Sequence, residues 1–129
     1  LIEYWGGQCA VSGCKEVSVL VASHIKPWRD CVENNEWIDP FNGLLLSPNI
    51  DAVFDKGFIT FDENGRIVIS KLLSQSDAEA LGISSSMTLR KNDERHQKFL
   101  AYHRSMVFMD KHDSSMDGKS GCGASPAWN

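Results

Sequence analysis

The chain has 129 residues, of which 42% are hydrophobic and 23% are charged. This length suits one compact domain with a single core and leaves no room for two. The formal net charge is −4 at pH 7, which excludes a protein that holds nucleic acid through bulk positive charge, so any contact with nucleic acid must be local.

The first part of the chain predicts two strands that flank a loop. Residues 9–13 predict a short strand and a turn, and residues 17–25 are rich in β-branched side chains, which favours a strand that ends near His24. Residues 26–40 lack a regular period and predict a loop. The apolar run 43–46 then predicts a second strand, antiparallel to the first.

A short helix and a hairpin are expected next. Ser47 is a typical N-cap and Pro48 a typical first helical residue, and Gly57 is a typical stop. Residues 58–61 and 66–69 alternate around a turn that contains Asn-Gly, which supplies the positive φ angles of a tight hairpin. The order so far is strand, loop, strand, helix and hairpin.

Two further helices are expected before a polar tail. Residues 76–81 predict a short capped helix, and residues 92–107 predict a longer amphipathic helix that closes the core. From residue 110 onward, Asp, Ser, Lys and Gly dominate, which predicts a flexible tail. We therefore expect an α+β domain over residues 1–109 and a tail over 110–129.

Several features bear on the cellular setting. No apolar stretch approaches the roughly 20 residues of a membrane-spanning helix, and the chain start lacks the pattern of a signal peptide. We expect a soluble, cytoplasmic protein with no membrane partner. The sequence does not open with Met, so we expect it to be part of a longer protein with additional domains.

The cysteines leave two interpretations open. Sparse cysteines without secretory features favour reduced thiols over disulfides. Cys9 and Cys14 have the spacing of half a zinc site, and Cys31 could add a third ligand, whereas Cys122 lies in the tail. A structural zinc on Cys9, Cys14 and Cys31 is therefore one hypothesis, and buried or free thiols are the other.

Four residues carry the case for chemistry: His24, Asn42, Asp51 and Asp55. Asp51 and Asp55 are four positions apart on a predicted helix, so both carboxylates can face one divalent cation. An imidazole is mostly neutral at pH 7 and can take a proton from a water that attacks phosphorus. Taken singly, each residue also has a purely structural interpretation, and their joint order favours the catalytic one.

The order of motifs resembles the HNH endonuclease family, whose fold is the ββα-metal or His-Me finger. The motifs are Ser-His-Ile-Lys-Pro-Trp at 23–28, Phe-Asn-Gly-Leu-Leu-Leu at 41–46 and Asn-Ile-Asp-Ala-Val-Phe-Asp-Lys-Gly at 49–57. The resemblance covers residues 5–70 and extends to Tyr-His-Arg at 102–104. It implies an α+β fold with a ββα-metal core, an extra β-hairpin and a closing C-terminal helix.

The resemblance also implies a role for each motif residue. His24 matches the general base, Asn42 the residue that ties down the loop, and Asp51 a metal ligand. Ser23 stands where many members carry a second metal ligand, and it is a poor ligand itself. Asp55 is therefore the candidate second ligand.

The expected activity is metal-dependent hydrolysis of DNA phosphodiester bonds, and the resemblance implies 5′-phosphate and 3′-hydroxyl products. Carboxylate ligands favour Mg²⁺ or Mn²⁺ over Zn²⁺ or Ni²⁺. By analogy we expect the cleavage domain of a longer restriction or defence protein, with target choice in another domain. Cutting both strands with one site per chain makes a homodimer plausible.

Cations near the motif are weaker candidates for contacts with DNA phosphates: Lys26, Arg29 and Arg104. Trp28 could touch a sugar or a base, although covering the core or the loop is the simpler role. His103 falls on the apolar side of its helix, and we interpret it as a structural histidine that hydrogen-bonds the loop.

Two alternatives from other classes stay open. The first is a catalytically silent HNH-like module that binds nucleic acid or protein, favoured by Ser23 and Asp51 in place of commoner ligands. The second is a small zinc-organised domain, for which zinc content is the test. Retained DNA binding without metal-dependent cleavage would support the first.

Overall fold

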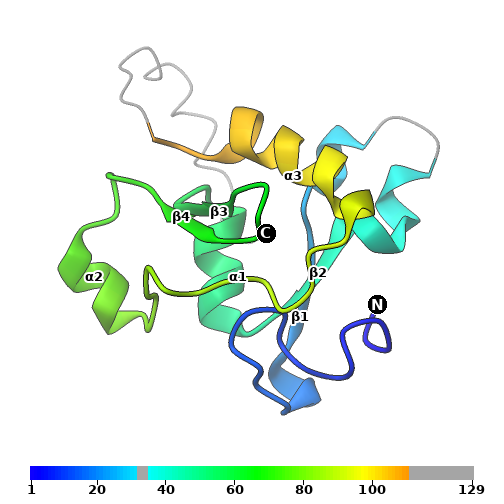
Figure 1. Ribbon diagram of the computed structural model, residues 1–129, viewed down its shortest axis with the longest axis horizontal. Coiled ribbons are helices and arrows are strands. Elements are labelled where there is room, and N and C mark those ends of the chain that lie inside the picture. Colours follow the sequence, from blue (N-terminus) through cyan, green and yellow to red (C-terminus); the bar gives the residue numbers. More distant parts are fainter. Residues whose placement is uncertain (32–34, 111–129) are drawn as a thin grey trace.

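The computed structural model describes residues 1–31 and 35–110, and it is an α+β fold. Two antiparallel strand pairs lie on either side of helix α1 (Pro48–Asp55), as Figure 1 shows. The first pair joins β1 (Val21–His24) to β2 (Gly43–Leu46), and the second joins β3 (Ile59–Phe61) to β4 (Ile67–Ile69). This order confirms the predicted strand, loop, strand, helix and hairpin.

The β1–β2 pair places the predicted base beside the start of the second strand. Its register pairs His24 with Gly43 and Val21 with Leu46. All four residues of β2 are buried, and the chain near Ala10 lies along the far edge of this strand. Ala10 donates its N–H to the Leu45 carbonyl. The second strand is therefore covered on its outer edge and cannot shift register without losing its core residues.

Helix α1 is held by its apolar face. Ile50, Val53 and Phe54 are buried, and the helix contacts both β1 and β3. Pro48 occupies the first turn as predicted, and Gly57 follows the helix with φ +85°, a left-handed conformation that only glycine adopts at low cost. The turn at Gly57 sends the chain directly into the second hairpin.

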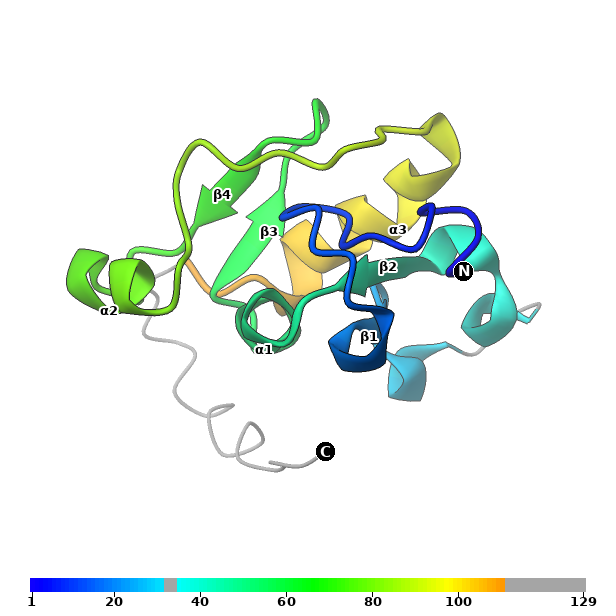
Figure 2. The same cartoon turned by 90° about the horizontal axis from the view of Figure 1, so that it is seen from below.

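The next predicted helix keeps its length of six residues with a shift of one residue, whereas the last helix is shorter than the sequence predicted. Helix α2 (Gln75–Ala80) is capped by Ser74, and α3 (Gln97–Tyr102) continues into a π-helical turn at His103–Val107. Figure 2 shows α2 at one end of the molecule, away from the β1–β2 pair. His103 is buried and stacks on Phe54 with ring centroids 3.9 Å apart. The end of α3 is thereby fixed to α1.

His103 has the structural role that we predicted, with different partners. Its Nε2 lies 2.9 Å from the Phe54 carbonyl and its Nδ1 lies 2.8 Å from the Thr60 hydroxyl, so it joins α1 to β3 and not to the loop. Because a carbonyl only accepts, Nε2 carries the proton and Nδ1 accepts from Thr60. Burial lowers the pKa of His103 to about 4, which keeps this arrangement neutral.

Several sequence predictions were wrong. Residues 9–13 form turns instead of a strand, and residues 17–19 form a 3₁₀ turn ahead of β1. Trp28 is 66% exposed, so it does not cover the core. Met106, within the amphipathic helix predicted over residues 92–107, is also 66% exposed. The predicted tail falls almost wholly on residues 111–129, outside the described residues.

Within the described part of the chain, no helix has the length and apolar character needed to span a membrane.

Candidate functional site

His24 ends β1 with its ring turned toward the loop that follows. Its Nε2 lies 2.8 Å from the backbone carbonyl of Trp37, thirteen residues along the chain. A carbonyl can only accept a hydrogen bond, so Nε2 carries the proton and Nδ1 keeps its lone pair. The His24 side chain is half-buried, so part of it is exposed to water and to a substrate.

Asn42 lies fully buried at the base of the same loop and joins its two ends. Its Oδ1 accepts the Lys26 N–H at 2.7 Å, and its Nδ2 donates to the Glu36 carbonyl at 3.1 Å. Nδ2 also lies 3.4 Å from the Lys26 carbonyl and 3.5 Å from the Cys31 sulfur. These bonds match the loop-tying role that the resemblance implied, and they give Asn42 no path to a reacting atom.

Asp51 and Asp55 lie one turn apart on α1, and Asp51 faces β1. The Ser23 hydroxyl hydrogen-bonds the Asp51 carboxylate. Burial raises the pKa of Asp51, the hydrogen bond from Ser23 opposes that rise, and the charge of Asp55 adds to it. Asp51 is half-buried and Asp55 is exposed. Two carboxylates therefore share one region of negative charge beside Ser23, the residue that precedes His24.

The three-cysteine zinc site is not assembled. Cys9 is buried and accepts N–H groups from Ser12 at 3.2 Å and Ser47 at 3.3 Å. Cys31 lies instead against the Pro27 carbonyl and Asn42. Among the described residues, no group of three or more His, Cys, Asp or Glu side chains is arranged to hold a metal ion. The separate local hydrogen bonds of Cys9 and Cys31 favour the hypothesis of buried thiols over that of a structural zinc.

The three candidate DNA-contacting cations differ in whether their charged groups already have a partner within the domain. Lys26 pairs with Glu36 at 2.9 Å, and Arg104 donates to the Phe61 carbonyl at 2.9 Å. Arg29 is exposed and makes no hydrogen bond or ion pair within the residues that the structure describes. Of the three, Arg29 is the one without a competing partner among the described residues, and a phosphate contact by any of them stays a prediction.

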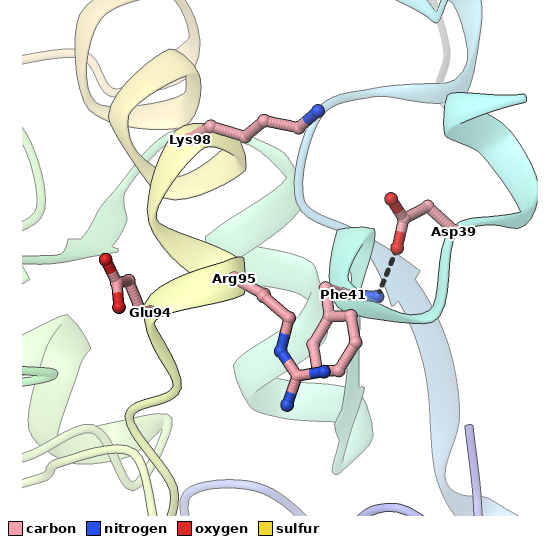
Figure 3. Close-up of a pocket in the computed structure, with 5 residues that line it drawn as sticks. All are labelled: Asp39, Phe41, Glu94, Arg95 and Lys98. Atoms are coloured by element: carbon pink, nitrogen blue, oxygen red, sulfur yellow. Dashed lines mark hydrogen bonds between the residues drawn. The ribbon is translucent and has the colours of Figure 1, made fainter. Parts of the chain in front are cut away.

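A cavity of about 300 Å³ lies beside the start of α3, as Figure 3 shows. Arg95 lies over the Phe41 ring at 4.1 Å, and the Asp39 carboxylate accepts the Phe41 N–H at 2.9 Å. Glu94 and Lys98 complete the lining, so acidic and basic side chains balance. None of the predicted catalytic or metal-binding residues lines this cavity, and its charge gives no preference for a phosphate.

Two contributors to the site escaped sequence reasoning. The Trp37 carbonyl is a backbone group, and no residue type signals it. The ion pair of Glu36 could have been predicted, since Glu36 is an acidic residue ten positions after Lys26 in the same loop. Ser23 was noticed only as a missing ligand, whereas its hydroxyl bonds Asp51.

Comparisons with known proteins bear on the family and on the fold. The HNH endonuclease family model matches residues 9–62, which span β1, the loop, β2, α1 and β3. A solved structure described as a modification-dependent TagI restriction endonuclease superposes with a TM-score of 0.51 at 20% identity, over 88% of this chain and 38% of that chain. This chain therefore spans about two fifths of that enzyme. A search of curated proteins finds no match. The family match and the shared fold therefore support an HNH endonuclease domain over residues 9–62.

Proposed function

We propose that this domain hydrolyses DNA phosphodiester bonds with one divalent cation, with His24 as the general base and Asp51 and Asp55 as metal ligands. The observation that carries the proposal is the 2.8 Å contact between His24 Nε2 and the Trp37 carbonyl. It fixes the tautomer in which Nδ1 can take a proton from water.

The proton transfer follows from this tautomer. A water molecule held near Nδ1 gives its proton to the ring and attacks phosphorus as a hydroxide equivalent. The ring then carries positive charge, which the Trp37 carbonyl dipole stabilises at the opposite nitrogen. Asn42 has no contact with the reacting atoms, and its part is to hold the loop that carries this carbonyl.

The acidic pair fits a divalent cation. Asp51 is half-buried next to the charge of Asp55. Its carboxylate has the Ser23 hydroxyl as a hydrogen-bond partner. Carboxylate oxygens suit Mg²⁺ or Mn²⁺, and water and phosphate oxygens complete the coordination of such ions. When bound, the cation would stabilise negative charge on the phosphate and on the leaving oxygen. Asp51 and Asp55 would hold it.

The biological setting is a further part of the proposal. The family resemblance supports DNA as substrate, a 5′-phosphate product, and a role as the cleavage domain of a restriction or defence protein in the cytoplasm. The 38% coverage of the TagI chain supports a separate targeting domain. The net charge of −4 agrees, because DNA affinity then has to come from elsewhere in the full-length protein. A homodimer would supply one site for each strand.

The metal assignment is tested by binding and cleavage together. We expect calorimetry to detect Mn²⁺ or Mg²⁺ binding and supercoiled plasmid to be nicked with either ion but not with EDTA. Asp51→Asn should abolish both. Asp77→Asn is a control, because Asp77 is also an acidic residue in the first turn of its helix, α2, and it should leave both unchanged.

The outcomes separate the alternatives. Loss of metal binding in Asp77→Asn but not in Asp51→Asn would contradict the ligand assignment. Plasmid binding without cleavage or metal binding in the wild type would favour a catalytically silent module. That alternative has one observation in its favour, since the described residues assemble no group of three metal-ligating side chains.

A further inference from the structure

An ion pair spans the loop beside the proposed base. Lys26 Nζ lies 2.9 Å from Glu36 Oε1, and the two side chains are only 16% and 13% exposed. The hydrogen bond that Lys26 donates to Glu36 raises the pKa of Lys26, so the lysine stays charged. Lys26 Nζ also lies 4.9 Å from the centre of the Tyr102 ring. A sheltered cation with both an acidic and an aromatic partner is poorly available to a phosphate.

The pair closes a ring of contacts that returns to His24. The chain runs from His24 to Lys26, the ion pair crosses to Glu36, and the next residue, Trp37, offers its carbonyl to His24 Nε2. Asn42 joins the backbones of Lys26 and Glu36 within the same ring. The backbone and the side chains of these two loop positions are thus tied independently.

The ring is also anchored to the closing helix. Tyr102, the last residue of α3, covers Lys26 with its ring and donates its hydroxyl to Asp30 at 2.9 Å. Figure 1 shows α3 lying alongside the loop that follows β1. The loop is therefore braced from a helix that lies more than 70 residues along the chain.

We propose that Lys26 and Glu36 are positioning residues, whose ion pair holds the Trp37 carbonyl against His24 and so keeps the Nδ1 lone pair directed at the attacking water. This inference rests on the proposed function of His24. It replaces the earlier interpretation of Lys26 as a DNA contact. It also explains why an acidic residue stands in a loop beside a polyanionic substrate.

The two interpretations of Lys26 predict opposite patterns. If Lys26 bound a phosphate, then Lys26→Gln would weaken DNA binding, and Glu36→Gln would strengthen it by removing a negative charge. If the pair positions the base, both variants lower the cleavage rate at saturating DNA and leave the half-saturating DNA concentration unchanged. Small misplacements of catalytic groups cost on the order of 10- to 100-fold in rate.

The experiment measures single-turnover cleavage of a duplex by the purified chain with Mn²⁺. We expect Lys26→Gln and Glu36→Gln each to lower the maximal rate about 10- to 100-fold, and the double variant to lose no more than the worse single one. Lys26→Arg should restore most of the rate. Lys98→Gln is the control, since Lys98 is a cation of α3 that forms no ion pair with any residue in the described part of the chain. Opposite effects of the two Gln variants, or unchanged maximal rates, would overturn the proposal.

A second readout does not need activity. Long-range ¹H–¹⁵N spectra report which nitrogen of the His24 ring carries the proton. We expect the Nε2-protonated form in the wild type and in Lys98→Gln, and a mixture of both tautomers in Lys26→Gln and Glu36→Gln. A single unchanged tautomer in all four proteins would overturn the positioning role. An inactive wild type with the expected tautomers would instead contradict the proposed function alone.

Discussion

The buried ring of His103 predicts that mild acid destabilises the protein. Burial lowers the pKa of His103 from 6.5 to about 4 in the folded protein. The same ring in the unfolded chain titrates near its ordinary value, so the unfolded chain binds one more proton between these limits. Stability is therefore complete above the unfolded pKa and falls as the pH drops from 6.5 toward 4.

The size of the effect follows from the two pKa values. One pKa unit corresponds to about 1.4 kcal/mol, and the linkage relation gives a loss of about 2 kcal/mol between pH 7.5 and pH 5 from this ring alone. Burial also lowers the pKa of His96, so that ring adds a loss of the same sign. Urea unfolding at the two pH values measures the total.

A variant isolates the contribution of His103. His103→Gln keeps a polar side chain next to Phe54 and Thr60 but cannot titrate, while His96 continues to contribute. We expect the difference in unfolding free energy between pH 7.5 and pH 5 to shrink by about 2 kcal/mol. An NMR titration of the wild-type ring is the second measurement. An unchanged difference in the variant, or a ring that titrates above pH 6, would refute the reasoning.

Three further predictions concern the frame of the site. Gly57→Ala should lower the free energy of unfolding by about 2 kcal/mol or more, because a Cβ at this position, where φ is +85°, meets the Val107 carbonyl. Gly82→Ala is the comparison, since a Cβ there meets only the Asn49 side chain. Urea unfolding should show a smaller loss of free energy for Gly82→Ala than for Gly57→Ala. Asn42→Ala leaves the Lys26 N–H without its buried acceptor and should cost about 2 kcal/mol or more by the same measurement. Elemental analysis of the folded protein should find far less than one zinc per chain, and stoichiometric zinc would contradict our account of the cysteines.

Local signals made much of the fold predictable. The N-cap and Pro48 start α1 where expected, and Gly65, with φ +81°, makes the turn between β3 and β4. The pairing of His24 with Gly43 follows from two apolar runs that flank a loop. The helix start and the hairpin turn depend on residues that are close in sequence, and the strand pair depends on two runs joined by one loop, which is why composition and spacing find them.

The errors arise where local hydrogen bonds and an irregular turn override the preference that a periodic pattern indicates. The Cys9 sulfur accepts N–H bonds from Val11 and Ser12, so the backbone at 9–13 turns instead of extending. At the end of α3, the π-helical turn rotates Met106 off the apolar face. A helical wheel assumes an unbroken period and cannot anticipate this turn.

The candidate site was predictable in residue types but not in connections. His24, Asn42, Asp51 and Asp55 follow from motif order, and their catalytic and metal-binding roles stay predictions. The bond between His24 and the Trp37 carbonyl depends on the path of an irregular loop, which no periodic pattern encodes.

The measurement that bears most directly on the central claim compares plasmid nicking by the wild type and by His24→Ala with Mn²⁺. Removing a general base costs on the order of 100-fold or more in rate. We predict that loss, with Mn²⁺ binding by calorimetry unchanged, because His24 is not a metal ligand in this account. Nicking by His24→Ala at the wild-type rate would contradict the assignment of His24 as the base.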